Sequence, residues 1–210
     1  GDWMIQNAAN GAVGQLVIKA AQARGIRTVN VVRSERGKAQ LAGQVLAVGK
    51  FSNCSGALVS PRWVLTASHC GLSAREWFCM GPDAAQPNRC VQAARVVDNP
   101  SGDMTLVKLA QDAREVIADV QPIPLFHEDL DSSWIGRTAE AAGYGQNEAG
   151  EYGRRAFTAE PISGLWGDLM TIDGQGRRGV CFGDSGGPVM VVASDGSVRV
   201  AGDLSNGDES

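Results

Sequence analysis

The sequence predicts a mainly β protein whose antiparallel strands follow a short strand–helix–strand segment. From about Val45 onward, short apolar runs are separated by Gly, Pro, Asn and Asp, and few stretches have helical periodicity. This pattern is typical of antiparallel strands in a barrel or a sandwich. Residues 1–36 differ, because a strand-like run, a small-residue turn, a helix-like run and a β-branched run follow one another there. We therefore expect two units, residues 1–40 and residues 41–210.

The first unit is expected to form a short βαβ fragment of Rossmann-like type. A strand, a glycine turn, a helix and a second strand are expected at residues 3–7, 8–14, 15–24 and 26–32. The backbone at Gly11 and Gly14 would be free to approach a pyrophosphate at the helix N-terminus. Without further parallel strands, both faces of this small sheet lack cover. The alternative is therefore an appendage that binds no nucleotide.

The run from Gly1 to Arg33, which includes Ala8-x-x-Gly11-x-x-Gly14, resembles part of a known family. It is similar to the NADPH-dependent 2-enoyl thioester reductases of the medium-chain reductase family. The resemblance implies an NADP(H) cofactor, with Gly11 and Gly14 against its pyrophosphate and Arg33 beside its 2′-phosphate. An NADPH-binding oxidoreductase fragment is thus one alternative function.

Composition and charge limit the other functional classes. The chain has 210 residues, 43% of them hydrophobic, and a net charge of −4, which describes a globular protein with one sizeable domain or two small ones. We expect no nucleic-acid partner, because such binding normally requires a basic patch. We expect no membrane span, because no apolar run approaches the roughly 18 residues required. No signal peptide is recognisable in this chain, so we expect a processed start at Gly1.

A glycine-rich segment holds the strongest candidate nucleophile. The run 183–188, Gly-Asp-Ser-Gly-Gly-Pro, places the Ser185 hydroxyl among backbone N–H groups that can face a substrate carbonyl. A serine becomes nucleophilic when an adjacent base takes its proton and a third group orients that base. His69 and Asp103, which lie upstream, can fill those two roles. Asp98 is a rival for Asp103, but it precedes Asn-Pro instead of an apolar strand.

The order His69, Asp103, Ser185 and the motifs around these residues resemble the chymotrypsin-like serine peptidases of the trypsin family. The resemblance implies an incomplete double antiparallel β-barrel of chymotrypsin type. It also implies that His69 is the general base, that Asp103 orients it, and that the N–H groups of Gly183 and Ser185 form the oxyanion hole. We therefore expect a serine endopeptidase that acts on protein or peptide substrates and requires no cofactor. An inactive, peptidase-shaped binding module is a further alternative.

The five cysteines are widely spaced. There is no Cys-x-x-Cys pair and there are only two histidines, so we expect no metal site. The family resemblance implies a disulfide between Cys54 and Cys70, while Cys79 and Cys90 could close a second loop. Cys181 is then unpaired, and we expect its partner to lie beyond the end of this chain. The peptidase unit is expected to be secreted or extracellular.

The same resemblance nominates residues that contact substrate. Gly179 would lie at the base of the primary pocket, and the lack of an acidic side chain there disfavours cleavage after Lys or Arg. Phe182 would border the pocket mouth. The segment that pairs with the substrate backbone would contain Ser205, Asn206 and Gly207.

Three features depart from the family pattern. No free Ile or Val N-terminus is available to pair with Asp184, so we expect this carboxylate to lack a partner and the oxyanion loop to be impaired. The family's first strand is replaced by the reductase-like run. The closing strand and the C-terminal helix are expected after Ser210. We therefore hypothesise a chimera whose peptidase unit is truncated at both ends.

Overall fold

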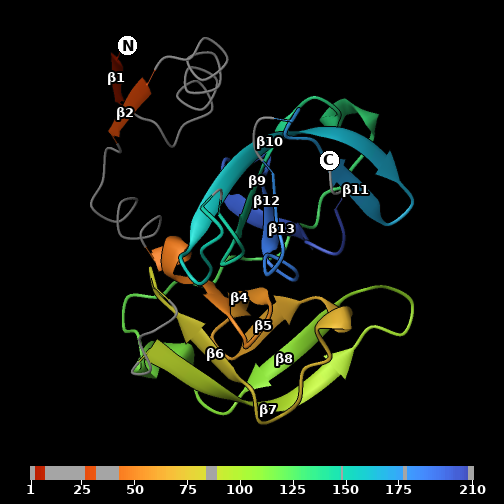
Figure 1. The fold of residues 1–210 in the computed structure, drawn as a ribbon. Helices are drawn as coiled ribbons and strands as arrows, with labels where there is room; N and C mark the ends of the chain where they lie inside the picture. The colour runs from red at the N-terminus through yellow and green to blue at the C-terminus, as the bar shows by residue number, and fades with distance from the viewer. Residues whose placement is uncertain are drawn as a thin grey trace.

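The computed structural model describes residues 3–7, 27–31, 43–83, 89–147, 149–176 and 179–207. Strands predominate in these ranges and form two large sheets, so the prediction of a mainly β protein is confirmed (Figure 1). None of the helices in these ranges is long and apolar enough to cross a membrane.

The first large sheet closes into a barrel. Six antiparallel strands pair in the order β3-β4-β5-β8-β7-β6, and β6 pairs back onto β3. Their bounds are β3 Val48–Lys50, β4 Ser55–Ser60, β5 Trp63–Thr66, β6 Trp77–Met80, β7 Cys90–Asp98 and β8 Thr105–Leu109. Because closure leaves no unpaired edge, every strand of this barrel is held on both sides.

Alternating side chains fill the barrel. Along β8, Val107 and Leu109 are fully buried, whereas Leu106, the residue before Val107, is exposed, as the two-residue period of a strand requires. The rings of Phe51 and Phe78 meet in the same core with centroids 5.1 Å apart. The barrel therefore has a packed interior and gives the loops at its ends a rigid base.

The second large sheet is a curled half-barrel. Five antiparallel strands pair in the order β11-β10-β9-β12-β13. Their bounds are β9 Thr138–Gly143, β10 Ala156–Trp166, β11 Leu169–Ile172, β12 Pro188–Val192 and β13 Val198–Asp203. Trp134, Ile162 and Leu204 are among the buried residues of its separate core. A closed barrel followed by an open one is consistent with the chymotrypsin fold and with the expectation of an incomplete second barrel.

A separate two-stranded sheet lies near the N-terminus. Strands β1 (Trp3–Asn7) and β2 (Arg27–Val31) run parallel, with Trp3 opposite Arg27. Two strands were expected in these positions. The predicted turn and helix, and with them Gly11, Gly14 and Arg33, lie outside the described residues. A Rossmann-like fragment with a nucleotide site is therefore not shown.

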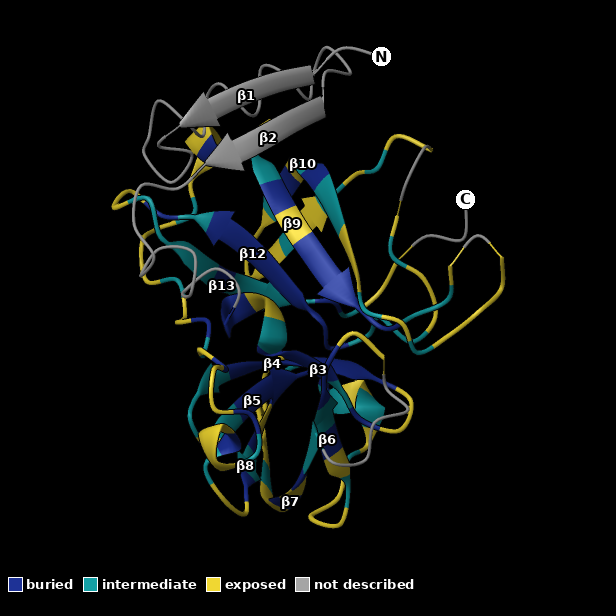
Figure 2. Cartoon of the chain, turned by 90° about the vertical axis from the view of Figure 1, so that its left-hand side faces the viewer, coloured by how far each residue is buried: buried dark blue, intermediate teal, exposed yellow. Residues whose placement is uncertain are grey.

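Tyr144 joins the two large sheets. Figure 2 shows buried segments, including β3 and β4, where the barrel meets the half-barrel. Tyr144 directly follows β9 of the half-barrel, is 2% exposed, and its hydroxyl donates to the carbonyl of Val48 at 3.0 Å in the barrel. It also contacts the carbonyl of Gly81 at 2.5 Å. This fully buried link holds the loops of both sheets in one arrangement.

Candidate active site

His69 is positioned by a short turn at the end of a barrel strand. Strand β5 ends at Thr66, and the 3-10 turn η1 (Ser68–Cys70) follows it. The turn ends at Gly71, whose φ of +59° favours glycine,. A disulfide between Cys54 and Cys70 ties the turn to the residue before β4. His69 is therefore held by covalent and backbone constraints while its side chain stays 43% exposed.

Asp103 accepts three hydrogen bonds. One oxygen, Oδ1, accepts from the backbone N–H of His69 at 2.8 Å. The other, Oδ2, lies 2.7 Å from His69 Nδ1 and accepts from the Ser205 hydroxyl at 2.5 Å. Burial opposes ionisation of Asp103, but the hydrogen bonds from Ser205 and His69 outweigh it and hold the pKa of this carboxyl below its usual value. Asp103 is therefore ionised at neutral pH.

The ionised state of Asp103 determines the tautomer of His69. A carboxylate can only accept, so the proton of a neutral imidazole must be on Nδ1. His69 Nε2 is then left with a free lone pair, which is the state required of a general base. The rival Asp98 instead accepts from the Thr105 hydroxyl at 2.5 Å. The structure thus pairs His69 with Asp103 and not with Asp98, while the catalytic roles of the pair stay predictions.

The segment that carries Ser185 packs directly on the strand that leads to His69. The Ser185 carbonyl accepts from the N–H of Ser55 at 2.8 Å, and the N–H of Gly186 donates to the Leu204 carbonyl at 2.7 Å. A Cβ at Gly186 would lie 2.1 Å from Thr66 Oγ1. The described residues contain no hydrogen bond between Ser185 and His69 side chains. Such bonds often tighten only when substrate is bound.

The peptide between Gly183 and Asp184 is held at both of its polar atoms. Its carbonyl, that of Gly183, accepts from the Ser55 hydroxyl at 2.8 Å, and its N–H, that of Asp184, donates to the Cys181 carbonyl at 3.0 Å. Gly183 has a φ of +94°, where a side chain is disfavoured,. Within the described part of the chain, the N–H groups of Gly183 and Ser185 have no acceptor. Both donors are therefore available to a carbonyl oxygen.

Asp184 has partners that the sequence did not reveal. Its two carboxylate oxygens accept from the N–H groups of Gly145 at 2.8 Å and of Cys181 at 2.9 Å. The expectation that this carboxylate lacks a partner was therefore wrong. A Cβ at Gly143 or Gly145 would lie 2.2 or 2.6 Å from the Asp184 carboxyl group, so these glycines make room for it. Burial still raises the pKa of Asp184, although both hydrogen bonds oppose the shift.

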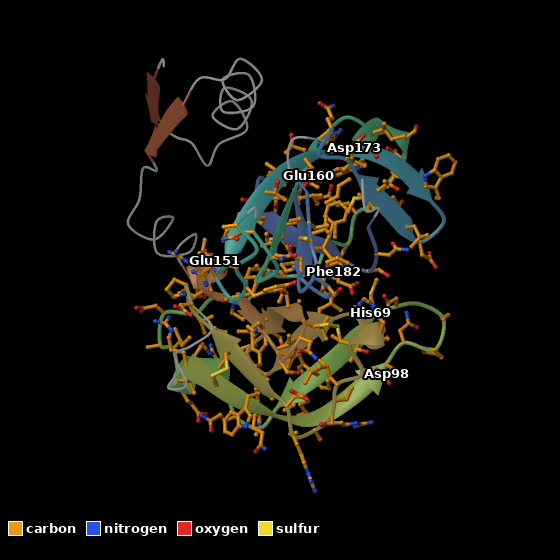
Figure 3. The ribbon with its side chains drawn as sticks, viewed as in Figure 1. His69, Asp98, Glu151, Glu160, Asp173 and Phe182 are labelled. Atoms are coloured by element: carbon orange, nitrogen blue, oxygen red, sulfur yellow. A yellow bond between two sulfur atoms is a disulfide. The ribbon has the colours of Figure 1, made fainter. Side chains whose placement is uncertain are left out.

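The predicted substrate-contact residues lie on two adjoining exposed segments. Gly179 is exposed, and a Cβ there would meet no atom within 4 Å. Phe182 is 64% exposed and, like His69, lies where the barrel faces the half-barrel (Figure 3). Asn206 and Gly207 are exposed, and a Cβ at Gly207 would lie 3.9 Å from Val180. Ser205 is partly buried, and its hydroxyl donates to Asp103; the pairing of its backbone with substrate stays a prediction.

Both predicted disulfides are present. Cys54 pairs with Cys70 and Cys79 with Cys90, whereas Cys181 is free and exposed. Cys54, His69 and Cys70 also form the one close group of possible metal ligands among the described residues. Its two sulfur atoms are joined to each other, so neither is a thiolate that could bind a metal.

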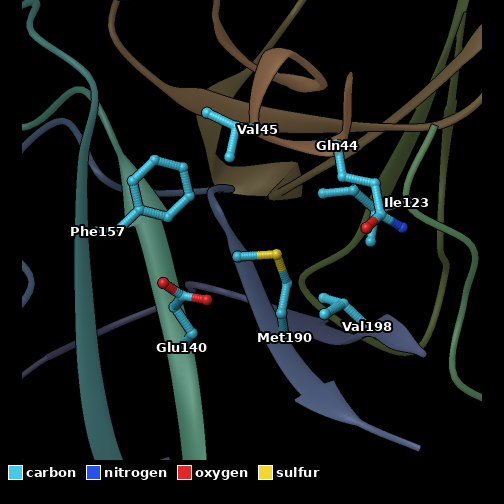
Figure 4. Close-up of a pocket in the computed structure, with 7 residues that line it drawn as sticks. All are labelled: Gln44, Val45, Ile123, Glu140, Phe157, Met190 and Val198. Atoms are coloured by element: carbon cyan, nitrogen blue, oxygen red, sulfur yellow. The ribbon is translucent and has the colours of Figure 1, made fainter. Parts of the chain in front are cut away.

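A concavity lies apart from these residues. Seven mostly apolar residues line it, none of them a predicted site residue (Figure 4). They come from the helical turn at 43–46, the segment between β8 and β9, and the four half-barrel strands β9, β10, β12 and β13. Glu140 is the one carboxylate among them, and the surrounding protein raises its pKa by desolvation.

Comparison with known families decides the assignment. The family model described as Trypsin matches residues 29–209. The chain belongs to the trypsin family of serine peptidases. "Serine protease ea" of Drosophila melanogaster is 29% identical over 192 residues, which cover 67% of this chain and 48% of that protein. This trypsin-family chain thus spans about half the length of that curated relative.

The same comparisons bear on the N-terminal segment. The trypsin-family match begins at residue 29, inside the run that resembles the reductases and before the predicted boundary near residue 40. Neither comparison supports a reductase segment or a chimera. The division at residue 40 stays a prediction.

Proposed function

We propose that this chain is a serine endopeptidase that hydrolyses peptide bonds in protein substrates through His69, Asp103 and Ser185. The observation that carries the proposal is the hydrogen bond of 2.7 Å between His69 Nδ1 and Asp103 Oδ2. It gives His69 an orienting carboxylate, while the Ser185 segment packs on the strand that precedes the histidine. Membership of the trypsin family supports a protein substrate.

The reaction follows from the protonation states. His69 Nε2 takes the proton from Ser185 Oγ as that oxygen attacks the scissile carbonyl, and later returns it to the leaving amine. Asp103 stabilises the imidazolium in the interval. The free N–H groups of Gly183 and Ser185 bind the oxyanion, and each such donor contributes about 3 kcal/mol to lowering the barrier. Water then hydrolyses the acyl-enzyme by the same proton transfers in reverse.

Specificity and location are part of the proposal. Gly179 supplies no negative charge at the predicted pocket base, so Lys and Arg are not the favoured side chains before the cleaved bond. We place the protein in a secreted or extracellular setting, which its two disulfides support,. No cofactor takes part in this chemistry.

A fluorophosphonate probe tests the function directly, because it reacts with a serine only where base and oxyanion hole activate it. We expect labelling of Ser185 in the chain, loss of labelling in Ser185→Ala and His69→Ala, and full labelling in the matched control Ser163→Ala. Ser163 lies on an exposed position of β10. A folded chain that the probe does not label would leave a peptidase-shaped binding module and refute the endopeptidase.

A further inference from the structure

Asp203 points toward the same side of its strand as Ser205. It is the last residue of β13 and lies opposite Pro188 of β12. In extended backbone, residues two apart face the same way. Leu204 between them is buried in the half-barrel core, and its backbone hydrogen bonds to Gly186 and Gly187 continue the ladder. Asp203 therefore faces the side on which Ser205 meets Asp103.

The Asp203 carboxyl is partly shielded and incompletely bonded. Its Oδ2 atom is shielded from solvent and has no hydrogen-bond partner in the described ranges. A polar oxygen in this state is costly unless it serves another purpose. Burial and the charge of Asp103 raise the pKa of Asp203 to about 6, whereas a hydrogen bond from its own backbone and the charge of His69 lower it. Both members of the His69–Asp103 pair thus act on this carboxyl.

We propose that Asp203 is a second carboxylate of the candidate site, a positioning residue that acts on His69 through space and, when ionised, favours its imidazolium form. The proposal rests on the proposed peptidase function, in which that imidazolium forms as Ser185 loses its proton. The charged groups that act on Asp203 are His69, from the turn after β5, and Asp103, from the β7–β8 loop. Its partner across the sheet, Pro188, is uncharged.

The coupling between the two groups is reciprocal. If a protonated His69 favours ionised Asp203, then ionised Asp203 favours protonated His69 by the same free energy. At a pH below the pKa of Asp203 its carboxyl group is neutral. Of the two carboxyl groups, only Asp103 then stabilises the imidazolium of His69. The protonation states of Asp203 and His69 are therefore linked.

NMR titration of His69 tests the inference without requiring activity. The chain has two histidines, so His127→Asn assigns the signals. We expect Asp203→Asn to lower the titration midpoint of His69 by about 0.5 to 1 pH unit relative to the parent chain. Asp168→Asn, which removes an exposed carboxylate at the β10–β11 turn, is expected to leave the midpoint unchanged. Asp203→Ser repeats the test with a smaller neutral side chain.

The pH profile of kcat/KM is a second, independent measurement of the same effect. The acid limb is expected to move to lower pH in Asp203→Asn, in step with the NMR midpoint. An unchanged or raised His69 midpoint in folded Asp203→Asn and Asp203→Ser would overturn the role of Asp203. Absence of probe labelling at Ser185 would instead refute the peptidase function, and the NMR arm would still decide whether Asp203 acts on His69.

Discussion

The hydroxyl of Ser55 donates a hydrogen bond of 2.8 Å to the carbonyl of Gly183, a residue 128 positions later in the sequence. The same oxygen accepts from the N–H of Tyr144 at 2.9 Å, and Ser55 is completely buried. One small side chain of the barrel thus connects the loop after β9 with the segment whose N–H groups face the proposed oxyanion. This connection holds that segment in addition to the backbone hydrogen bonds that Asp184 accepts from Gly145 and Cys181.

Replacement of Ser55 tests this connection. Ser55→Ala removes the donor to Gly183 and leaves the buried N–H of Tyr144 unsatisfied, which costs about 1–3 kcal/mol. We expect a lower unfolding free energy and at least tenfold slower probe labelling of Ser185. The matched control is Ser60→Ala, at the other end of β4, where the serine is only partly buried. Equal labelling rates in the two variants would contradict the proposed role of the hydroxyl.

The glycines beside Asp184 give a steric prediction. Gly145→Ala places a methyl group 2.6 Å from the Asp184 carboxyl, so the carboxylate must move and lose the Gly145 N–H bond. We expect a destabilisation of about 1–3 kcal/mol and a loss of probe labelling, both measured on purified variants. Gly202→Ala serves as control, because a Cβ there meets nothing within 4 Å. The prediction fails if the two alanine variants behave alike.

Asp103 gives a prediction about proton position. In Asp103→Asn the side-chain amide can donate a hydrogen bond to His69 Nδ1. The proton of the neutral imidazole is then on Nε2, so His69 can no longer take the proton of Ser185. We expect kcat to fall by about 10⁴-fold with little change in folding. The measurement is kcat on a peptide ester beside the thermal unfolding curve. Asp98→Asn, which alters the rival carboxylate, is expected to retain activity, and a comparable loss there would contradict the assignment.

Asp203 gives a prediction about stability and pH. Its pKa is about 6 in the folded chain, above the value of about 3.9 for an unfolded aspartate. The folded state therefore holds this proton more tightly, and the resulting stability is present below about pH 4 and lost as the pH rises through 6.

Asp203→Asn should accordingly be more stable relative to the parent chain at pH 8 than at pH 4. The difference has an upper limit of about 3 kcal/mol for a shift of this size, reduced by the partial exposure of the residue. Urea unfolding at the two pH values measures it. An equal effect of the substitution at both pH values would show that Asp203 has an ordinary pKa.

The sequence correctly predicted those features of the site that depend on a short run of neighbouring residues. The resemblance of the run from Cys54 to Cys70 to the trypsin family implied a disulfide beside His69, and the structure contains it. Asp103 was preferred to Asp98 because an apolar strand follows it, and the hydrogen bonds agree. The reductase resemblance of the run from Gly1 to Arg33 is not supported by the comparisons, although β1 and β2 do form a parallel pair.

By itself, the sequence determined the mainly β class and nominated His69, Asp103 and Ser185, because these depend on strand periodicity and contiguous motifs. The Cys54–Cys70 disulfide followed from the resemblance of those motifs to the trypsin family. Only the tertiary structure decided the bond from Ser55 to Gly183, the backbone partners of Asp184, the contact of Ser205 with Asp103 and the orientation of Asp203. Each of these depends on which faces of distant segments meet. That depends on strand register and on the packing of the barrel against the half-barrel, since a shift of one residue turns every side chain of a strand to the opposite face.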